Sequence, residues 1–173
     1  LHETLTQFPT VWPAILAMDT ARYLAFAGAA FLLLWPLRGP LERFRIQKRK
    51  AGVRDMRREI GWSLSTSVIF SLNGFFLVWG LAQVGVVDIH HDTGGWIIAL
   101  EVVAIVIAHD AWFYWLHRAM HGRRLFRAVH LTHHRSITPS PWAAYAFSPA
   151  EALAEALFLP AFLLALNIDG LTI

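Results

Sequence analysis

Five of the nine histidines lie between residues 117 and 134, in two spaced groups, His117-x-x-x-His121 and His130-x-x-His133-His134. Neutral imidazole is a common protein ligand of iron and zinc. Residues four positions apart share one face of a helix, so the first group directs two rings toward one point. The second group, at positions i, i+3 and i+4, is expected to direct three. The pattern predicts a metal site built from histidine side chains.

Two residues that precede the first histidine pair lie on the same helical stripe. Asp110, Tyr114, His117 and His121 follow the spacing i, i+4, i+7 and i+11. A carboxylate or hydroxyl that accepts the distal N–H of a ligating imidazole fixes its tautomer and raises its basicity. We therefore expect Asp110 and Tyr114 to lie behind the ligands, although Asp110 could instead form an ion pair near the helix end. His109 lies about 80° from His117 around the helix, so it either joins the site or flanks it.

The elements that must position these histidines are strongly apolar. The chain is 56% hydrophobic, with a mean hydropathy of +0.46, twelve Phe and eight Trp, a composition typical of a multi-pass membrane protein. Three runs close to the ~20 residues that a bilayer requires predict spanning helices at about 21–37, 61–87 and 96–115. A fourth run, at about 152–168, contains Pro160, which leaves a kinked span, a re-entrant helix and an interfacial helix open.

Basic residues concentrate between the first two predicted spans. Residues 38–58 hold nine of the fifteen Lys and Arg, and by the positive-inside rule this stretch faces the cytoplasm. Alternating spans then place residues 118–135 on the same side and only Arg22 on the other. A charge cluster beside a span sets orientation or meets anionic lipid, so nucleic-acid binding is not expected despite a pI of about 9.8.

These observations predict an all-α fold, a multi-pass transmembrane bundle with a histidine-rich cap on its cytoplasmic side. One membrane domain is expected to cover residues 1–173. The membrane would be a bacterial inner membrane or the endoplasmic reticulum.

The segment around the histidines resembles a known family. HDAWFYWLHRAMH, HLTHH and RSITPSPWAAYAFSPAEA, within about residues 108–159, are together similar to the fatty acid hydroxylase and sterol desaturase superfamily of membrane enzymes. The resemblance implies two non-haem irons, or zinc as a substitute, in an all-histidine shell. It also implies that O2 and two electrons from an external, unidentified donor serve to hydroxylate or desaturate a lipid C–H bond. The ligands that it implies are His117, His121, His130, His133 and His134, with His109 as a possible sixth and Asp110 and Tyr114 behind them.

Two departures from the family pattern bear on this assignment. Members carry a third box, another His-x-x-His-His, on a later helix, whereas no histidine follows His134 here. We therefore expect the chain to be the front part of a longer enzyme, or a remnant of one, and to be catalytically silent alone. Many sterol desaturases also carry His where Ser148 stands, which argues against a specific sterol desaturase assignment.

Two other classes of function remain open. A bis-histidyl haem electron carrier would clasp one haem iron between two helices, although adjacent His133 and His134 are poor geometry for it. The absence of cysteine excludes disulfides, thiolate metal sites and haem attachment through Cys. A non-catalytic membrane metal-binding protein would use the same imidazoles, for example with zinc. No residue selects among fatty acyl chains, sterols, ether lipids and carotenoids, and no flavin, haem or nicotinamide motif identifies the electron donor.

Overall fold

Helices dominate the computed structural model of the chain, which describes residues 2–44, 48–86, 89–90, 94–166 and 168–169. The α-helices are α1 (His2–Leu34), α2 (Val53–Asn73), α3 (Gly80–Gln83), α4 (Gly95–Met120), α5 (Leu131–His134), α6 (Pro149–Ala156) and α7 (Phe158–Ala165). The 3-10 turns are η1 (Pro36–Arg38), η2 (Glu42–Phe44) and η5 (Pro141–Ala143), and the π-helical segments are η3 (Gly74–Trp79) and η4 (Phe126–His130). Strands β1 (Ile89–His90) and β2 (Ile168–Asp169) pair in parallel, in the register Ile89↔Ile168 and His90↔Asp169. Apart from this short pair, the predicted all-α class is confirmed.

Three helices are long and apolar enough to cross a membrane. They cover Leu5–Leu34, the continuous helix Val53–Gln83 and Gly95–Met120. The three predicted spans are therefore confirmed, and each helix is longer than the apolar run that predicted it. The largest extension is in α1, which accommodates Pro9 and Pro13 within its N-terminal half.

The fourth apolar run, expected at about 152–168, contains two short helices. α6 ends at Ala156, and α7 begins at Phe158. Pro160 has no N–H to donate to the carbonyl of Ala156, so a single α-helix cannot continue through this point with its hydrogen bonds intact. Of the three alternatives that the sequence left open, a kinked helix fits this break. α6 packs against α2, and α7 packs against η3 and α4.

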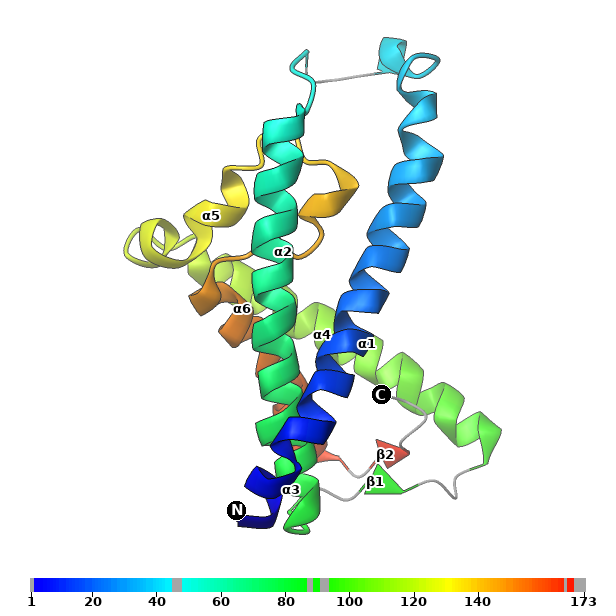
Figure 1. Cartoon of the computed structure of the whole chain (residues 1–173), viewed down its shortest axis with the longest axis vertical. Coiled ribbons are helices and arrows are strands. Elements are labelled where there is room, and N and C mark those ends of the chain that lie inside the picture. The colour runs from blue at the N-terminus through cyan, green and yellow to red at the C-terminus, as the bar shows by residue number, and fades with distance from the viewer. Residues whose placement is uncertain (1, 45–47, 87–88, 91–93, 167, 170–173) are drawn as a thin grey trace.

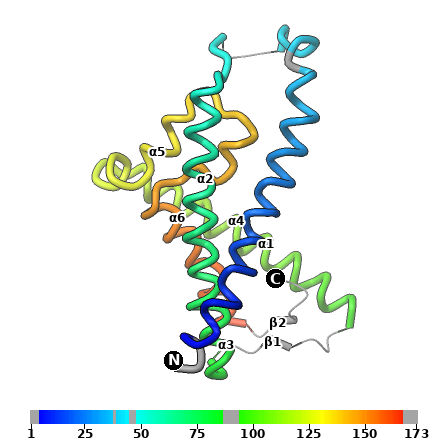
Figure 2. The backbone as a smooth tube through the Cα atoms, in the orientation of Figure 1, coloured from blue at the N-terminus to red at the C-terminus, as the bar shows by residue number. Residues whose placement is uncertain are grey.

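Helices α1 and α2 meet near the N-terminal end of α1 and diverge toward the other end, while α4 crosses behind α2 (Figures 1 and 2). At the junction, the ring of Phe8 meets that of Phe75 edge-on at 5.1 Å, and Trp12 donates its Nε1–H to the hydroxyl of Ser71 at 3.1 Å. Further along α1, the hydroxyl of Tyr23 donates to the carbonyl oxygen of Trp142 at 2.9 Å. α1 is thus tied both to α2 and to the segment that follows the second histidine group.

The buried face of α2 is polar. Its buried residues are Asp55, Glu59, Ser63, Thr66, Ser67, Ser71 and Asn73. Apolar side chains such as Leu64 and Val68 are exposed on the opposite side. This distribution is typical of a membrane helix that turns its polar face toward protein and its apolar face toward lipid.

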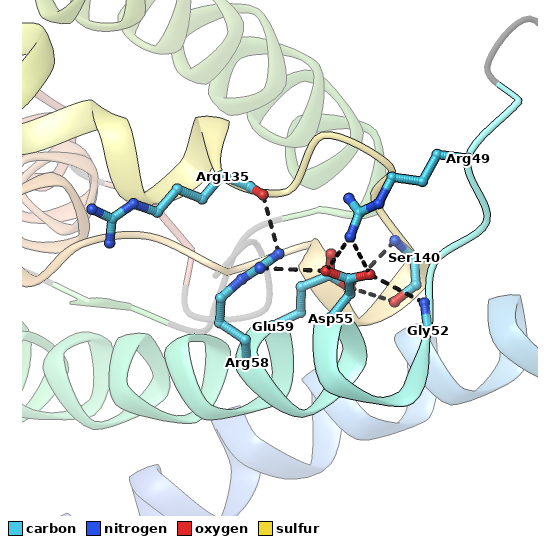
Figure 3. A network of polar contacts seen from close by, with 7 residues as sticks. All are labelled: Arg49, Gly52, Asp55, Arg58, Glu59, Arg135 and Ser140. Atoms are coloured by element: carbon cyan, nitrogen blue, oxygen red, sulfur yellow. Dashed lines mark hydrogen bonds and ion pairs between the residues drawn. The ribbon is translucent and has the colours of Figure 1, made fainter.

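The N-terminal part of this polar face holds the segment that follows His134 (Figure 3). Arg58 donates from Nη2 to the carbonyl oxygen of Arg135 at 3.1 Å. Glu59, which is fully buried, accepts hydrogen bonds from the hydroxyl and the backbone N–H of Ser140. One turn earlier, Asp55 pairs with the Arg58 guanidinium at 3.4 Å. The backbone after the second histidine group is therefore fixed by side chains of α2.

Candidate metal centre

Four histidines converge at the point where the chain reverses after α4. His117 and His121 lie one turn apart at the C-terminal end of α4, where the backbone N–H of His121 donates to the carbonyl of His117. His130 ends η4 and His134 ends α5. One ligand atom from each of these four side chains lies within 4.8 Å of the others. Nitrogen ligands about 2.0–2.1 Å from one metal are at most about 4.2 Å apart, so small side-chain movements suffice to close the group on one ion.

His133 lies beside this cluster and not within it. Its ring is stacked on that of His130 with centroids 5.4 Å apart, and it meets the ring of Phe147 at 5.4 Å. Consecutive helical residues point about 100° apart, so His133 and His134 cannot both face the point that His130 faces. Within the described residues, the buried Nδ1 of His133 has no hydrogen-bond partner, which leaves this nitrogen free for a further interaction.

The second histidine group has a buried acidic partner, Glu151. Nδ1 of His130 and Oε1 of Glu151 are 2.7 Å apart, and the two side chains are 0% and 1% exposed. Nε2 of His130 is buried and has no hydrogen-bond partner among the residues that the structure covers. An imidazole that donates one N–H to a carboxylate presents its other nitrogen to a metal in a fixed orientation. The contact between His130 and Glu151 has the geometry that this arrangement requires.

The charges of this pair follow from its burial. Burial is the largest cause of both shifts: it lowers the pKa of His130 to about 4 and raises the pKa of Glu151 to about 8. Burial also lowers the pKa of His133 and of His134. Neutral imidazoles are the form that ligates metal, so burial prepares the cluster for a cation. A cation bound nearby would in turn favour the carboxylate form of Glu151.

The start of α6 is held against η4, which places Glu151 on His130. Ser148 is the N-cap of α6 and accepts a hydrogen bond from the backbone N–H of Glu151 at 3.2 Å. The same hydroxyl donates to the carbonyl oxygen of Val129. Ser148 thus bonds at once to the residue before His130 and to the helix that carries Glu151. This one side chain couples the two elements of the pair.

An apolar cavity of about 820 Å³ lies next to the histidines. Two of its lining residues contact the histidine cluster or His133 beside it: Phe113 stacks on His117 with centroids 5.4 Å apart, and the rings of Phe147 and His133 are 5.4 Å apart. The remaining lining residues come from α1, α2, η3, α4, α6, α7 and the turn after η5. They are Ile15, Met18, Asp19, Arg22, Phe70, Asn73, Gly74, Val78, Trp79, His109, Ala144, Tyr145, Glu155, Ala156, Phe158 and Leu159. The cavity is suited to a hydrocarbon that reaches as far as the two phenylalanine rings.

Comparison with known proteins agrees with the arrangement of histidines. Residues 102–173 match the fatty acid hydroxylase family. A Delta(7)-sterol 5(6)-desaturase of Leptosphaeria maculans is 28% identical over 162 residues, which cover 90% of this chain and 42% of that protein. Lathosterol oxidase of Rattus norvegicus is 34% identical over 71 residues, or 40% of this chain and 24% of that protein. These matches support membership of the fatty acid hydroxylase and sterol desaturase superfamily.

The superfamily is one of oxidoreductases, and the resemblance drawn from the two boxes is confirmed. A further relative, Delta(7)-sterol 5(6)-desaturase erg3C of Aspergillus fumigatus, is 32% identical over 107 residues, or 59% of this chain and 32% of that protein. The chain spans less than half the length of these three relatives. No solved structure matches it. The prediction that Ser148 argues against a specific sterol desaturase assignment stays a prediction.

Asp110 and Tyr114, which the sequence predicts behind the ligands, are both exposed on α4. Tyr114 is 52% exposed, and its hydroxyl accepts a hydrogen bond from Nη1 of Arg118 at 2.9 Å. Asp110 is exposed on α4. Among the described residues, no hydrogen bond joins either side chain to a histidine. Their predicted role behind the ligands therefore stays a prediction.

His109, which the sequence predicts as a possible ligand, lines the cavity. It precedes His117 by about two helical turns, and its ring meets that of Phe158 edge-on at 5.0 Å. It is not one of the four converging histidines.

Glu151 is the site residue that the sequence interpretation missed. The signal for it was the Ser148-Pro149-x-Glu151 pattern, which is typical of a helix start with an acid in its first turn.

Proposed function

We propose that this chain carries the histidine-box part of a membrane-bound, O2-dependent, non-haem di-iron oxidoreductase that hydroxylates or desaturates a lipid C–H bond. One observation carries the proposal: four imidazoles converge within 4.8 Å beside an apolar cavity of about 820 Å³. The relatives are named as sterol desaturases and a lathosterol oxidase, so a Δ7-sterol is the first substrate to test. The histidines are proposed to lie on the cytoplasmic side, on the positive-inside argument.

The residues present fit iron. Imidazole nitrogens suit iron and zinc, and the buried Nε2 of His130 has no other partner in the described part of the chain. When bound, iron and O2 would supply the oxidant that C–H cleavage needs. The ligands of one ion are proposed to be His117, His121, His130 and His134, and the free Nδ1 of His133 is proposed to bind a second ion that needs further ligands.

The chain's own residues have three tasks in this proposal. Glu151 holds the His130 imidazole in one orientation through the 2.7 Å contact at Nδ1. Phe113 and Phe147 form the wall between the histidines and the cavity, so they limit how far the lipid reaches. The apolar lining excludes water from the reacting carbon, which protects the oxidising species from side reactions. Electrons come from an external donor.

The test uses single variants of the full-length protein. His121→Ala and His133→Ala are expected to lower bound iron and abolish Δ7-sterol oxidation, whereas His90→Ala changes neither. Bound metal is measured by elemental analysis and turnover by substrate-dependent O2 consumption. Normal turnover in the His121 variant contradicts the ligand assignment. Zinc in place of iron, without O2 consumption, favours the non-catalytic metal protein, and a haem absorption band in the visible spectrum favours the electron carrier.

A further inference from the structure

Glu155 is a buried acid that the histidine cluster does not use. Its side chain is 8% exposed, and it lines the apolar cavity. Within the described residues, neither carboxylate oxygen has a hydrogen-bond partner. Asn73 of α2 lines the same cavity, is also 8% exposed, and has an unpaired Nδ2. The cavity therefore contains an unpaired acid and an unpaired amide in mostly apolar surroundings.

Unpaired polar groups in a protein interior are rare, because each loses its hydrogen bonds to water without replacement. The charged groups nearby do not account for Glu155, because Glu151 is bonded to His130 and Arg22 is the charged neighbour of Asp19 on α1. A ligand in the cavity would supply what is missing. A hydroxyl group matches this chemistry, since it can donate to a carboxyl oxygen and accept from an amide N–H.

Helix α6 connects Glu155 to the histidine cluster. Glu151 and Glu155 are four residues apart on α6, so they lie on one face of the helix, separated by a rise of about 6 Å. Glu151 contacts His130, and Glu155 lines the cavity. A group bonded to Glu155 therefore lies about one helical turn from the residue that orients the histidine.

We propose that Glu155 binds a hydroxyl group of the lipid substrate, with Asn73 as a second hydrogen-bonding residue of the same cavity. The substrate is then a lipid alcohol, such as a sterol, and it is oxidised close to the hydroxyl and not at the far end of the hydrocarbon. This inference rests on the proposed function, because it treats the cavity as the substrate site. A carotene or another hydrocarbon without a polar group would leave Glu155 unpaired.

The experiment compares two ligands on the full-length protein in lipid nanodiscs. One is a radiolabelled Δ7-sterol and the other is the matching Δ7-sterene, which lacks the hydroxyl group. Equilibrium binding without electron donor should show a preference of about 10- to 100-fold for the alcohol. Glu155→Leu should abolish this preference while sterene binding and bound iron stay unchanged, and Glu155→Gln should retain part of it. The control Leu159→Ala, an apolar lining residue, should weaken both ligands by similar factors.

Results from the wild-type protein and from the Glu155→Leu protein can each overturn the inference. One is equal binding of the two ligands by the wild-type protein, a measurement that does not depend on the folding of any variant. The other is an unchanged alcohol preference, or a loss of iron, in the Glu155→Leu protein, since the first shows no contact and the second shows a role at the metal. If the proposed function is wrong but the inference is right, the experiments give a different set of results. In that case the wild-type protein prefers the alcohol and Glu155→Leu abolishes the preference, yet no sterol is oxidised.

Discussion

Replacing Glu151 by Gln tests whether this acid orients His130. The substitution keeps the size of the side chain and removes the negative charge that a bound cation favours, so in the metal-bound protein the 2.7 Å contact changes from a charge-assisted hydrogen bond to a neutral one. Hydrogen bonds to charged groups contribute about 1.5–3 kcal/mol, and both partners are almost fully buried. At about 1.4 kcal/mol for each factor of ten, the expected loss of metal affinity is about 10- to 100-fold.

The assay is competition for Fe(II) between the protein and a chromogenic chelator at fixed pH. Asp110→Asn is the matched control, because it neutralises an exposed acid on α4 that has no contact with a histidine in the described structure. Its effect should be less than about twofold, since surface charges far from partners contribute little. A larger loss in Asp110→Asn than in Glu151→Gln would refute the reasoning and support the sequence-based assignment of Asp110.

Three further outcomes are expected. Single cysteines at Gly52 and Gly94, which start α2 and α4 in a chain without cysteine, should label from opposite sides of a sealed membrane, and labelling from one side contradicts the topology. Ser148→Ala removes the N-cap of α6 and should cost about 0.5–2 kcal/mol, seen as a lower melting temperature, whereas Ser65→Ala should have no such effect. The 173-residue chain alone should bind one metal ion without sterol-dependent O2 consumption, because two irons need roughly eight to ten nitrogens. Two bound irons per chain would show that this ligand count is wrong.

The spans and the first histidine pair could be predicted because they depend on local sequence. A long apolar run specifies a membrane helix, and the i, i+4 spacing of His117 and His121 places two rings together on any helix. The geometry of the second group was harder to predict, because its three histidines lie in the π-helical segment η4 and the short helix α5 and not in one regular α-helix. As a result, only His130 and His134 of that group join the cluster, and His133 stacks beside it.

The roles of Glu151 and Glu155 could not be predicted, because they arise from tertiary packing. In the sequence, both acids look like charges at the start of a fourth span. Their environment is decided by the break before α7 and by the docking of α6 on α2, which buries both side chains. Asp110 is a different case: its helical position favours a place behind the ligands, whereas the structure leaves it exposed on α4, so its role stays a prediction.

The family match covers residues 102–173, yet the candidate metal centre depends on the part of the chain before it. The segment after His134 is held at Arg135 and Ser140 by Arg58 and Glu59 of α2. The carbonyl of Trp142 in the same segment accepts hydrogen bonds from helices α1 and α2, and α6 packs on α2. Since α6 carries Glu151, a change in the polar face of α2 would alter the orientation of His130 without touching any histidine. The matched segment therefore supplies the ligands, and α1 and α2 supply the surface that fixes their geometry.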